Sequence, residues 1–122
     1  NGDDLLLGGK GSDLLIGGRG ADEFQFNFKD SLPGPKERDT IRDFNRGQGD
    51  VVNLSGIDGD RSENGKQDLT FIGRDVDFTA AGQVRFDTEK SFLEVNFNDD
   101  LGADIRIDMG DLKTFGADDL LL

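Results

Sequence analysis

The sequence predicts an all-β chain, with a repetitive parallel part at the N-terminus and an antiparallel part after it. Three observations lead to this class. Residues 1–25 repeat a glycine–aspartate pattern with a nine-residue period. Beyond them, short runs that alternate apolar and polar residues are separated by turn-forming residues, as in half-buried strands. No segment has the apolar spacing of an amphipathic helix three turns long.

The repeat occurs in three copies in register: Asn1–Leu7, which lacks the two leading glycines, Gly8–Ile16 and Gly17–Gln25. Each copy fits G-G-x-G-x-D-x-U-x, the nonapeptide of calcium-binding RTX proteins. Glycines permit tight turns and leave backbone carbonyls uncovered, and Ca²⁺ prefers six to eight oxygen ligands. A single Gly-x-Asp turn is common, but three copies in register indicate the last turns of a parallel β-roll around Ca²⁺.

The last three residues of each copy are expected to form a short strand whose central side chain points inward, namely Leu6, Leu15 and Phe24. Two copies complete one turn of a roll, so turns on the same side lie 18 residues apart. Asp4 and Asp22 would then approach one ion from adjacent coils. The flanking side chains that would point outward are Leu5, Leu7, Leu14 and Ile16. They form either a contact surface or scattered surface positions.

The RTX resemblance also implies a set of ligands. In that family, positions three, five and six of one copy share an ion with positions two, four and six of the next copy on the same side. The first ion would be held by Asn1, Asp3 and Asp4 with Gly18, Gly20 and Asp22. Later ions would use Lys10, Ser12 and Asp13, and Arg19, Ala21 and Asp22. Only the position-six aspartates need to bind through side chains, and the other residues would donate carbonyls.

The partners of the second and third copies would lie near positions 31 and 40. Asp30 and Asp39 lie one residue short of those positions, in chain that no longer follows the repeat, and are the predicted ligands there. The implied cofactor is Ca²⁺, in two to three ions.

The rest of the chain predicts a second unit. The roll is assigned to residues 1–28 and a small antiparallel β-sandwich to residues 29–122. Phe24, Phe26 and Phe28 alternate on one strand face, and a loop with both prolines follows at 30–36. The apolar alternation at 84–86, 93–97 and 105–109 predicts an antiparallel meander with one buried face.

Six motifs carry a further resemblance through nearly all of this region: Gly20–Phe24, Asp39–Phe44, Asn53–Asp58, Leu69–Gly73, Ala80–Val84 and Ala103–Ile105. In this order they resemble the C-terminal domain of serralysin-type secreted metalloproteases. The resemblance implies a β-roll capped by a β-sandwich that binds calcium and carries an uncleaved signal for a type I exporter. The turn Asn96–Leu101 departs from the Asp-x-Asn-Gly-Asp-Gly loop of some relatives, which argues against a further ion there.

Composition excludes several functions. The formal charge is −12, with neither His nor Cys, which argues against nucleic-acid binding, a serralysin-type zinc centre and disulfides. No apolar run approaches a membrane span. The predicted function is a non-catalytic module of a secreted, extracellular protein, which folds when it meets Ca²⁺. Its expected partners are an upstream domain and the ABC exporter of a type I secretion apparatus. The exporter would read Asp118–Leu122, of which Leu120–Leu122 can also form a last strand.

One alternative is a Ca²⁺-dependent polysaccharide-binding or adhesion module on an extracellular enzyme such as an alginate epimerase. The acidic charge and the lack of Trp and Tyr argue against direct binding of a polyanion, but bridging through Ca²⁺ would allow it. The sequence upstream of Asn1 would distinguish these functions.

Overall fold

The computed structural model of the chain describes residues 2–7, 12–26, 38–57, 69–97 and 102–122. These residues contain strands and two short 3₁₀ helices but no α-helix. The strands are β1 (Leu5–Leu7), β2 (Leu14–Leu15), β3 (Glu23–Gln25), β4 (Asp39–Ile41), β5 (Val51–Asn53), β6 (Thr70–Arg74), β7 (Gln83–Asp87), β8 (Phe92–Asn96), β9 (Ile105–Asp108) and β10 (Leu120–Leu121). The 3₁₀ helices are η1 (Arg46–Gln48) and η2 (Ala117–Asp119). The predicted all-β class is confirmed.

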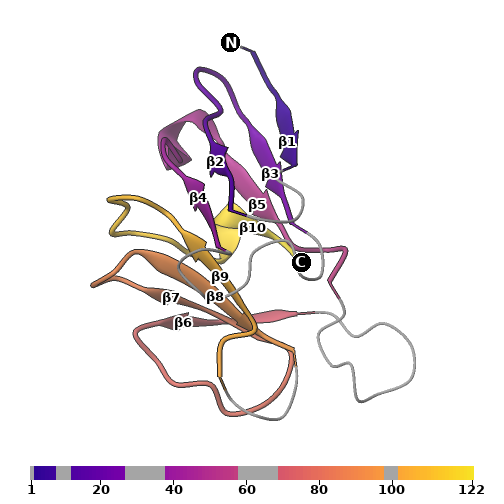
Figure 1. The fold of residues 1–122 in the computed structure, drawn as a ribbon, viewed down its shortest axis with the longest axis vertical. Coiled ribbons are helices and arrows are strands. Elements are labelled where there is room, and N and C mark those ends of the chain that lie inside the picture. The colour runs from indigo at the N-terminus through magenta and orange to yellow at the C-terminus, as the bar shows by residue number, and fades with distance from the viewer. Residues whose placement is uncertain (1, 8–11, 27–37, 58–68, 98–101) are drawn as a thin grey trace.

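The first five strands alternate between two sheets (Figure 1). One sheet has the order β1-β3-β5-β10, and the other has the order β2-β4-β9-β8-β7-β6. Strand β1 pairs with β3 in parallel, with Leu6 opposite Phe24, which is the predicted offset of 18 residues. Strands β4 and β5 continue the two columns in parallel, on β2 and β3. The alternation therefore runs to Asn53, past the predicted boundary at residue 28, which itself lies outside the described residues.

The inward positions follow the prediction. Phe24 is fully buried, Leu15 is buried and Leu6 packs against the core. The corresponding residues of the next two strands, Ile41 and Val52, are also fully buried. Each strand contributes one apolar side chain to a shared core because side chains alternate between the two faces of a strand.

The second half of the chain has an antiparallel centre. Strand β8 lies antiparallel to both β7 and β9, and a turn at 87–91 joins β7 to β8. The apolar side chains predicted from the alternation are all buried in this region, as are Glu94 and Asn96: Val84, Phe86, Leu93, Val95, Phe97, Ile105, Ile107 and Met109. The edges of this region are parallel, since β6 pairs with β7 in parallel and β9 pairs with β4 in parallel.

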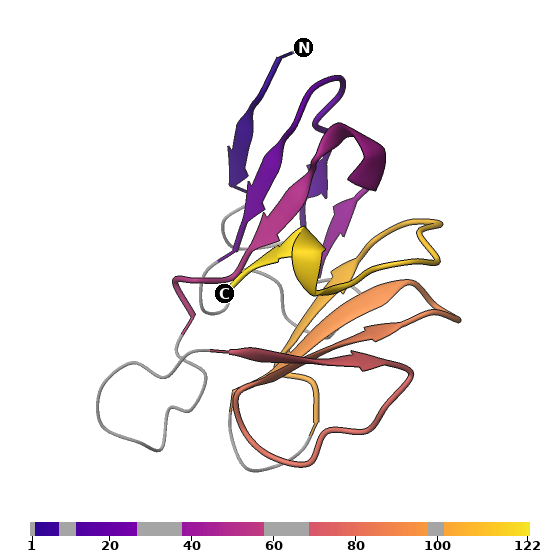
Figure 2. The ribbon, with the colours of Figure 1, turned by 180° about the vertical axis from the view of Figure 1, so that it is seen from behind.

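Each of the two parallel stacks of strands, β2-β4 and β1-β3-β5, ends beside a strand from later in the sequence. Strand β9 continues the column β2-β4, and β10 lies beside β5 at the end of the column β1-β3-β5 (Figure 2). Phenylalanines join the two regions: Phe44 lies 6.1 Å from Phe24 and 5.6 Å from Phe115, and Phe115 lies 5.4 Å from Phe86, as measured between ring centroids. One hydrophobic core therefore runs through both regions.

Candidate metal centre

Aspartates that precede or begin neighbouring strands of the same sheet form a ladder: Asp4, Asp13, Asp22, Asp39 and Asp50. Each strand together with the turn before it is called a coil. Asp22 Oδ1 accepts a hydrogen bond from the backbone N–H of Asp4 at 2.9 Å, and Asp50 Oδ1 accepts one from the N–H of Asp22 at 2.8 Å. On the other side, Asp39 Oδ1 accepts from the N–H of Asp13 at 2.7 Å. Each carboxylate thus binds the backbone of the equivalent aspartate one coil earlier. This contact explains why a short acidic side chain recurs at position six.

The turns between coils have further contacts of the same kind. Asp3 Oδ1 accepts from the N–H of Ala21 at 2.8 Å, and Ser12 Oγ donates to the carbonyl of Arg38 at 2.8 Å. Asp43 accepts from the N–H groups of Gly17 and Gly18, at 2.9 and 2.7 Å. Asp43 and Asp50 were not among the predicted ligands.

In two of the ladder carboxylates, only one of the two oxygens accepts a hydrogen bond from the described residues. The Oδ2 atoms of Asp13 and Asp22 are buried and have no hydrogen-bond partner among the described residues. Asp22 is 1% exposed, so water does not solvate its free oxygen. A buried oxygen without a partner costs about 1–3 kcal/mol, and a carboxylate costs more. A cation placed against these oxygens would remove that cost.

Glycine is required at two places in these turns. Gly20 has φ +109°, a conformation that side chains rarely adopt, and a Cβ there would collide with the carbonyl of Gly2. A Cβ on Gly17 would lie 2.7 Å from the Cγ of Asp22. The repeat glycines therefore bring the backbone directly against the aspartates of the ladder.

Asp50 is the ladder residue whose pKa is raised. Burial is the main cause, and the negative charges of Asp22 and Asp43 add to it. The hydrogen bonds from the N–H groups of Asp22 and Asn45 act in the opposite direction. The negative charges of Asp22 and Asp43 are therefore near enough to Asp50 to add to the effect of burial on its pKa. A nearby cation would stabilise all three charged forms.

The residues fit calcium only if backbone oxygens take part. Within the described parts of the chain, no three His, Cys, Asp or Glu side chains lie close enough together to hold a metal ion. A set of carbonyls joined by one or two aspartates suits Ca²⁺, which takes six to eight oxygen ligands. Asp13 and Asp22 offer free carboxylate oxygens, and the exposed turn that contains Gly18, Arg19, Gly20 and Ala21 offers carbonyls. These residues belong to the donor set that the repeat predicts, and their role as ligands stays a prediction.

The structure places some predicted ligands and leaves others out. Asn1, Lys10 and Asp30 lie outside the described residues. Asp39 does lie in the ladder, but it contacts Asp13, whereas the sequence count paired it with Asp22. The partner of Asp22 is Asp50. The offsets in the ladder are 18, 26 and 28 residues, so inserted chain displaces the later aspartates by eight and ten residues from a strict repeat.

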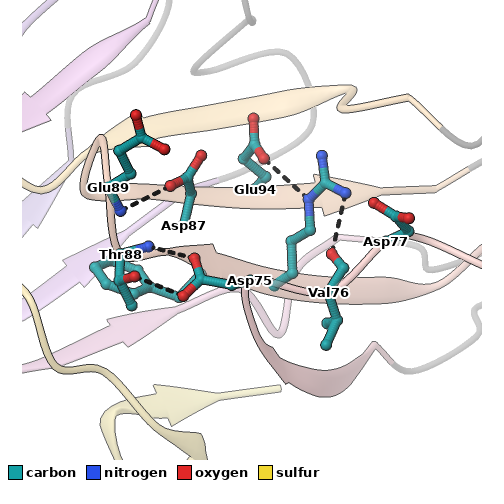
Figure 3. A pocket seen from close by; sticks show the side chains of 9 residues that line it. Asp75, Val76, Asp77, Asp87, Thr88, Glu89 and Glu94 are labelled. Atoms are coloured by element: carbon teal, nitrogen blue, oxygen red, sulfur yellow. Dashed lines mark hydrogen bonds and ion pairs between the residues drawn. The ribbon is translucent and has the colours of Figure 1, made fainter.

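A second polar region lies beside β7, in a hollow of about 390 Å³ (Figure 3). Two of its acidic side chains, Asp75 and Glu94, have side-chain partners. Asp75 accepts from Thr88, chiefly from its hydroxyl, which lowers the pKa of Asp75 from its ordinary value of 3.8. Glu94 is paired with Arg85 at 3.0 Å and with Arg106 at 2.6 Å. These contacts are made within the sheet and the turns beside it, so the two carboxylates serve to hold the strands together.

Comparison with known proteins assigns the chain to a family. Across the described segments, no helix has the length and apolar character needed to cross a membrane. No curated protein matches the sequence significantly. The family model described as Peptidase M10 serralysin C terminal matches residues 4–122. This match takes in nearly every residue, including the ladder and the antiparallel region. The chain therefore belongs to the serralysin C-terminal family of the M10 peptidases.

Proposed function

We propose that this chain is a non-catalytic, calcium-dependent folding module of a secreted protein. In this proposal, residues 5–53 form a β-roll that binds two to three Ca²⁺ ions, and the later strands cap it. The module is disordered at the low calcium concentration of the cytosol and folds in the extracellular medium. It belongs with an upstream domain, and its C-terminus is the signal for a type I exporter.

The half-satisfied aspartate ladder carries this proposal. Asp22 Oδ1 is held by the backbone of Asp4, while its Oδ2 is buried and free of hydrogen bonds from the described residues. This arrangement is unfavourable by itself and becomes favourable when a cation binds. The match to the serralysin C-terminal family supports a role as an accessory module of a secreted enzyme.

The binding energy is large enough for a folding switch. Extracellular calcium modules bind with dissociation constants of roughly 10⁻⁴–10⁻³ M. At millimolar Ca²⁺ and a constant of ~10⁻⁴ M, each ion contributes about 1.4 kcal/mol by mass action. Two to three ions then contribute about 3–4 kcal/mol, a large part of the stability of a small domain. At submicromolar Ca²⁺ this contribution disappears.

Circular dichroism in EGTA and then in millimolar CaCl₂ tests the proposal. We expect Ca²⁺ to increase the strand signal and to raise the melting temperature. Asp22→Asn retains an oxygen for the N–H of Asp4 but replaces the free Oδ2 with an NH₂ group, so it is expected to lose much of the Ca²⁺ response. Asp111→Asn, at an exposed turn, is the control and is expected to respond like the wild type. A wild-type chain equally folded in EGTA and in CaCl₂ contradicts the proposal.

A further inference from the structure

Another hollow, of about 500 Å³, lies between η1, β6 and the turn before η2. Among the described residues, its lining contains two arginines and no acidic side chain: Arg46, Phe71, Gly73, Arg74, Thr114, Phe115 and Gly116. The chain carries 26 acidic and 14 basic residues, so a hollow whose charged groups are all positive departs from its overall composition. The hollow is therefore suited to an anion.

A one-residue register shift in β6 decides where Arg74 lies. Strand β6 is the outer strand of its sheet (Figure 1), and it pairs with β7 in parallel. Phe71 lies opposite Val84, the extra residue Ile72 has no partner, and Arg74 then lies opposite Phe86. Because Val84 and Phe86 are fully buried, the shift brings Arg74 to the face of the sheet that meets the core. Regular alternation from Phe71 would have put Arg74 on the outer face.

Arg74 has no direct counter-ion at this position. It forms no hydrogen bond and no ion pair with the described residues. Its charge lowers the pKa of Asp75, but the hydrogen bonds from Thr88 lower that pKa more. The carboxylate of Asp75 points to Thr88 in the hollow beside β7 (Figure 3). The guanidinium of Arg74 is therefore free to bind a ligand.

Arg46 contributes a second guanidinium to the hollow from η1. Its Nε lies 2.7 Å from Oδ2 of Asp119, and its side chain remains 38% exposed. The same oxygen of Asp119 accepts from the N–H of Gly116 at 2.9 Å, which fixes the carboxylate. A guanidinium has five N–H donors in a planar fork, so an ion pair through Nε leaves donors for a second anion. The ion pair therefore positions Arg46 without occupying all of its donors.

Aromatic side chains give the hollow an apolar part. The rings of Phe71 and Phe115 lie edge to face, with 6.2 Å between their centroids. Phe115 is buried, whereas Phe71 is partly exposed, so a ligand in the hollow would contact the ring of Phe71. Small-molecule sites typically have volumes of about 300–1,000 Å³ and combine apolar walls with a few polar groups. The hollow has both properties.

We propose that this hollow binds a small organic carboxylate. The carboxylate lies between the guanidiniums of Arg46 and Arg74, and the apolar body of the ligand lies against Phe71. The planar fork of arginine matches the geometry of a carboxylate and binds it through charge-assisted hydrogen bonds. A free organic acid and the C-terminus of a peptide present this same group. The site is separate from the aspartate ladder, and the inference does not depend on calcium-dependent folding.

Titration of the chain with phenylacetate in millimolar CaCl₂, followed by ¹H–¹⁵N NMR, tests the inference. We expect saturable shifts of the backbone amides of Gly73, Thr114 and Gly116, which line the hollow. The control ligand, 2-phenylethylamine, has a similar apolar body with a positive charge, and we expect no saturable shifts with it. A peptide that ends in a free carboxylate, acetyl-Ala-Phe, and its C-terminal amide form the second pair of probes. Tighter binding of acetyl-Ala-Phe than of phenylacetate would identify the ligand as a peptide terminus, and the reverse order would identify it as a free acid.

Three variants test the roles of the arginines. Arg74→Gln removes the guanidinium that has no counter-ion, and we expect it to weaken phenylacetate binding at least tenfold. Arg46→Lys keeps a positive charge for Asp119 but loses the planar fork, so it is also expected to bind more weakly. Arg42→Gln is the matched control, because it removes the same charge at an exposed position outside the lining, and it should bind like the wild type. Circular dichroism in CaCl₂ checks that each variant is folded.

Arg74 has one alternative role, which the same variants separate from ligand binding. A charged side chain on the inner face of an outer strand can prevent that strand from pairing with another molecule. If this is the role of Arg74, Arg74→Gln will associate at high concentration in sedimentation velocity, and its affinity for phenylacetate will not differ from that of the wild type. That result, or a folded wild-type chain without a saturable response to either carboxylate, overturns the inference. Calcium-dependent folding is unaffected by either outcome.

Discussion

At the scale of single residues, aspartate is suited to the ladder because its two oxygens have different tasks. Oδ1 of Asp22 binds a backbone N–H on the preceding coil, and this contact fixes the side chain. Oδ2 is then held in a buried position where a cation would satisfy it. Glutamate would add a rotatable bond, and asparagine would offer one oxygen. Glycine completes the arrangement, since the close approach of Gly17 leaves no room for a side chain.

Gly17→Ala tests this close approach. The added Cβ would lie 2.7 Å from Cγ of Asp22 and force the carboxylate away, and Gly17 does not have a positive φ. We expect a loss of about 1–3 kcal/mol in the free energy of unfolding and a weaker response to Ca²⁺. Gly116→Ala is the control, because its Cβ would meet no atom closer than 3.9 Å. Denaturation in CaCl₂ measures both, and equal stabilities would show that Asp22 has room to move.

At the scale of elements, the sequence predicted strands wherever the repeat spacing continues. The three-residue strands and their inward side chains follow from the position of each aspartate, as Leu6 opposite Phe24 shows. The prediction failed for the partners of Asp13 and Asp22, because inserted chain separates the third repeat from β4 and β5. Counting in steps of 18 cannot locate Asp50, which is 28 residues after Asp22. A signal was present, since Asp50 precedes an apolar strand just as Asp22 does.

The contact of Gln48 with the third repeat could not be predicted in the same way. Its loop has no repeat motif, and its closeness to Gly18 arises only when β5 pairs with β3. The pairing of β9 with β4 is likewise a long-range contact that no local pattern specifies. Local periodicity therefore predicted strands and buried faces, whereas the arrangement of the sheets depended on contacts between distant segments.

The last strand, β10, pairs with β5 at the end of one sheet, and its two leucines allow a matched test. Leu120 is 7% exposed and pairs with Val52, whereas Leu121 is 42% exposed. Leu120→Ala should lower the free energy of unfolding by about 2–4 kcal/mol, because it empties a buried position. Leu121→Ala should cost less than about 1 kcal/mol. Urea denaturation in CaCl₂ gives both values, and similar losses would show that β10 contributes little to the packing.

The packing of β10 should also affect the position of η1. Arg46 of η1 forms an ion pair with Asp119 at 2.7 Å, just before β10 begins. The pair is partly buried on the side of Asp119, so it holds the two segments more firmly than an exposed pair would. The end of the chain and η1 are therefore linked, which connects the C-terminus to the turn before Asp50.

At the scale of the whole molecule, charge and core act in opposite directions. The chain has a net charge of −12, and its ladder gathers carboxylates between the coils. The phenylalanines joining Phe24 to Phe86 require the two regions to form together. Without a cation, repulsion in the ladder should therefore weaken the capping strands as well. We therefore expect a chain with this coupling to stay unfolded as a whole in low calcium, which is the state that the proposed type I exporter would accept.

Export of two variants from cells that produce a type I exporter tests this coupling. Deletion of residues 118–122 removes the proposed signal, so we expect the chain to remain inside the cells. Asp22→Asn leaves the signal intact, and its chain should reach the medium at the wild-type level, since we expect it too to be unfolded in the cytosol.

In millimolar Ca²⁺ outside, added protease should digest this variant faster than the wild type, because the ladder no longer holds its ion. Immunoblots of cells and medium measure export; retention of Asp22→Asn, or secretion of the shortened chain, would show that folding and export depend on other parts of the molecule.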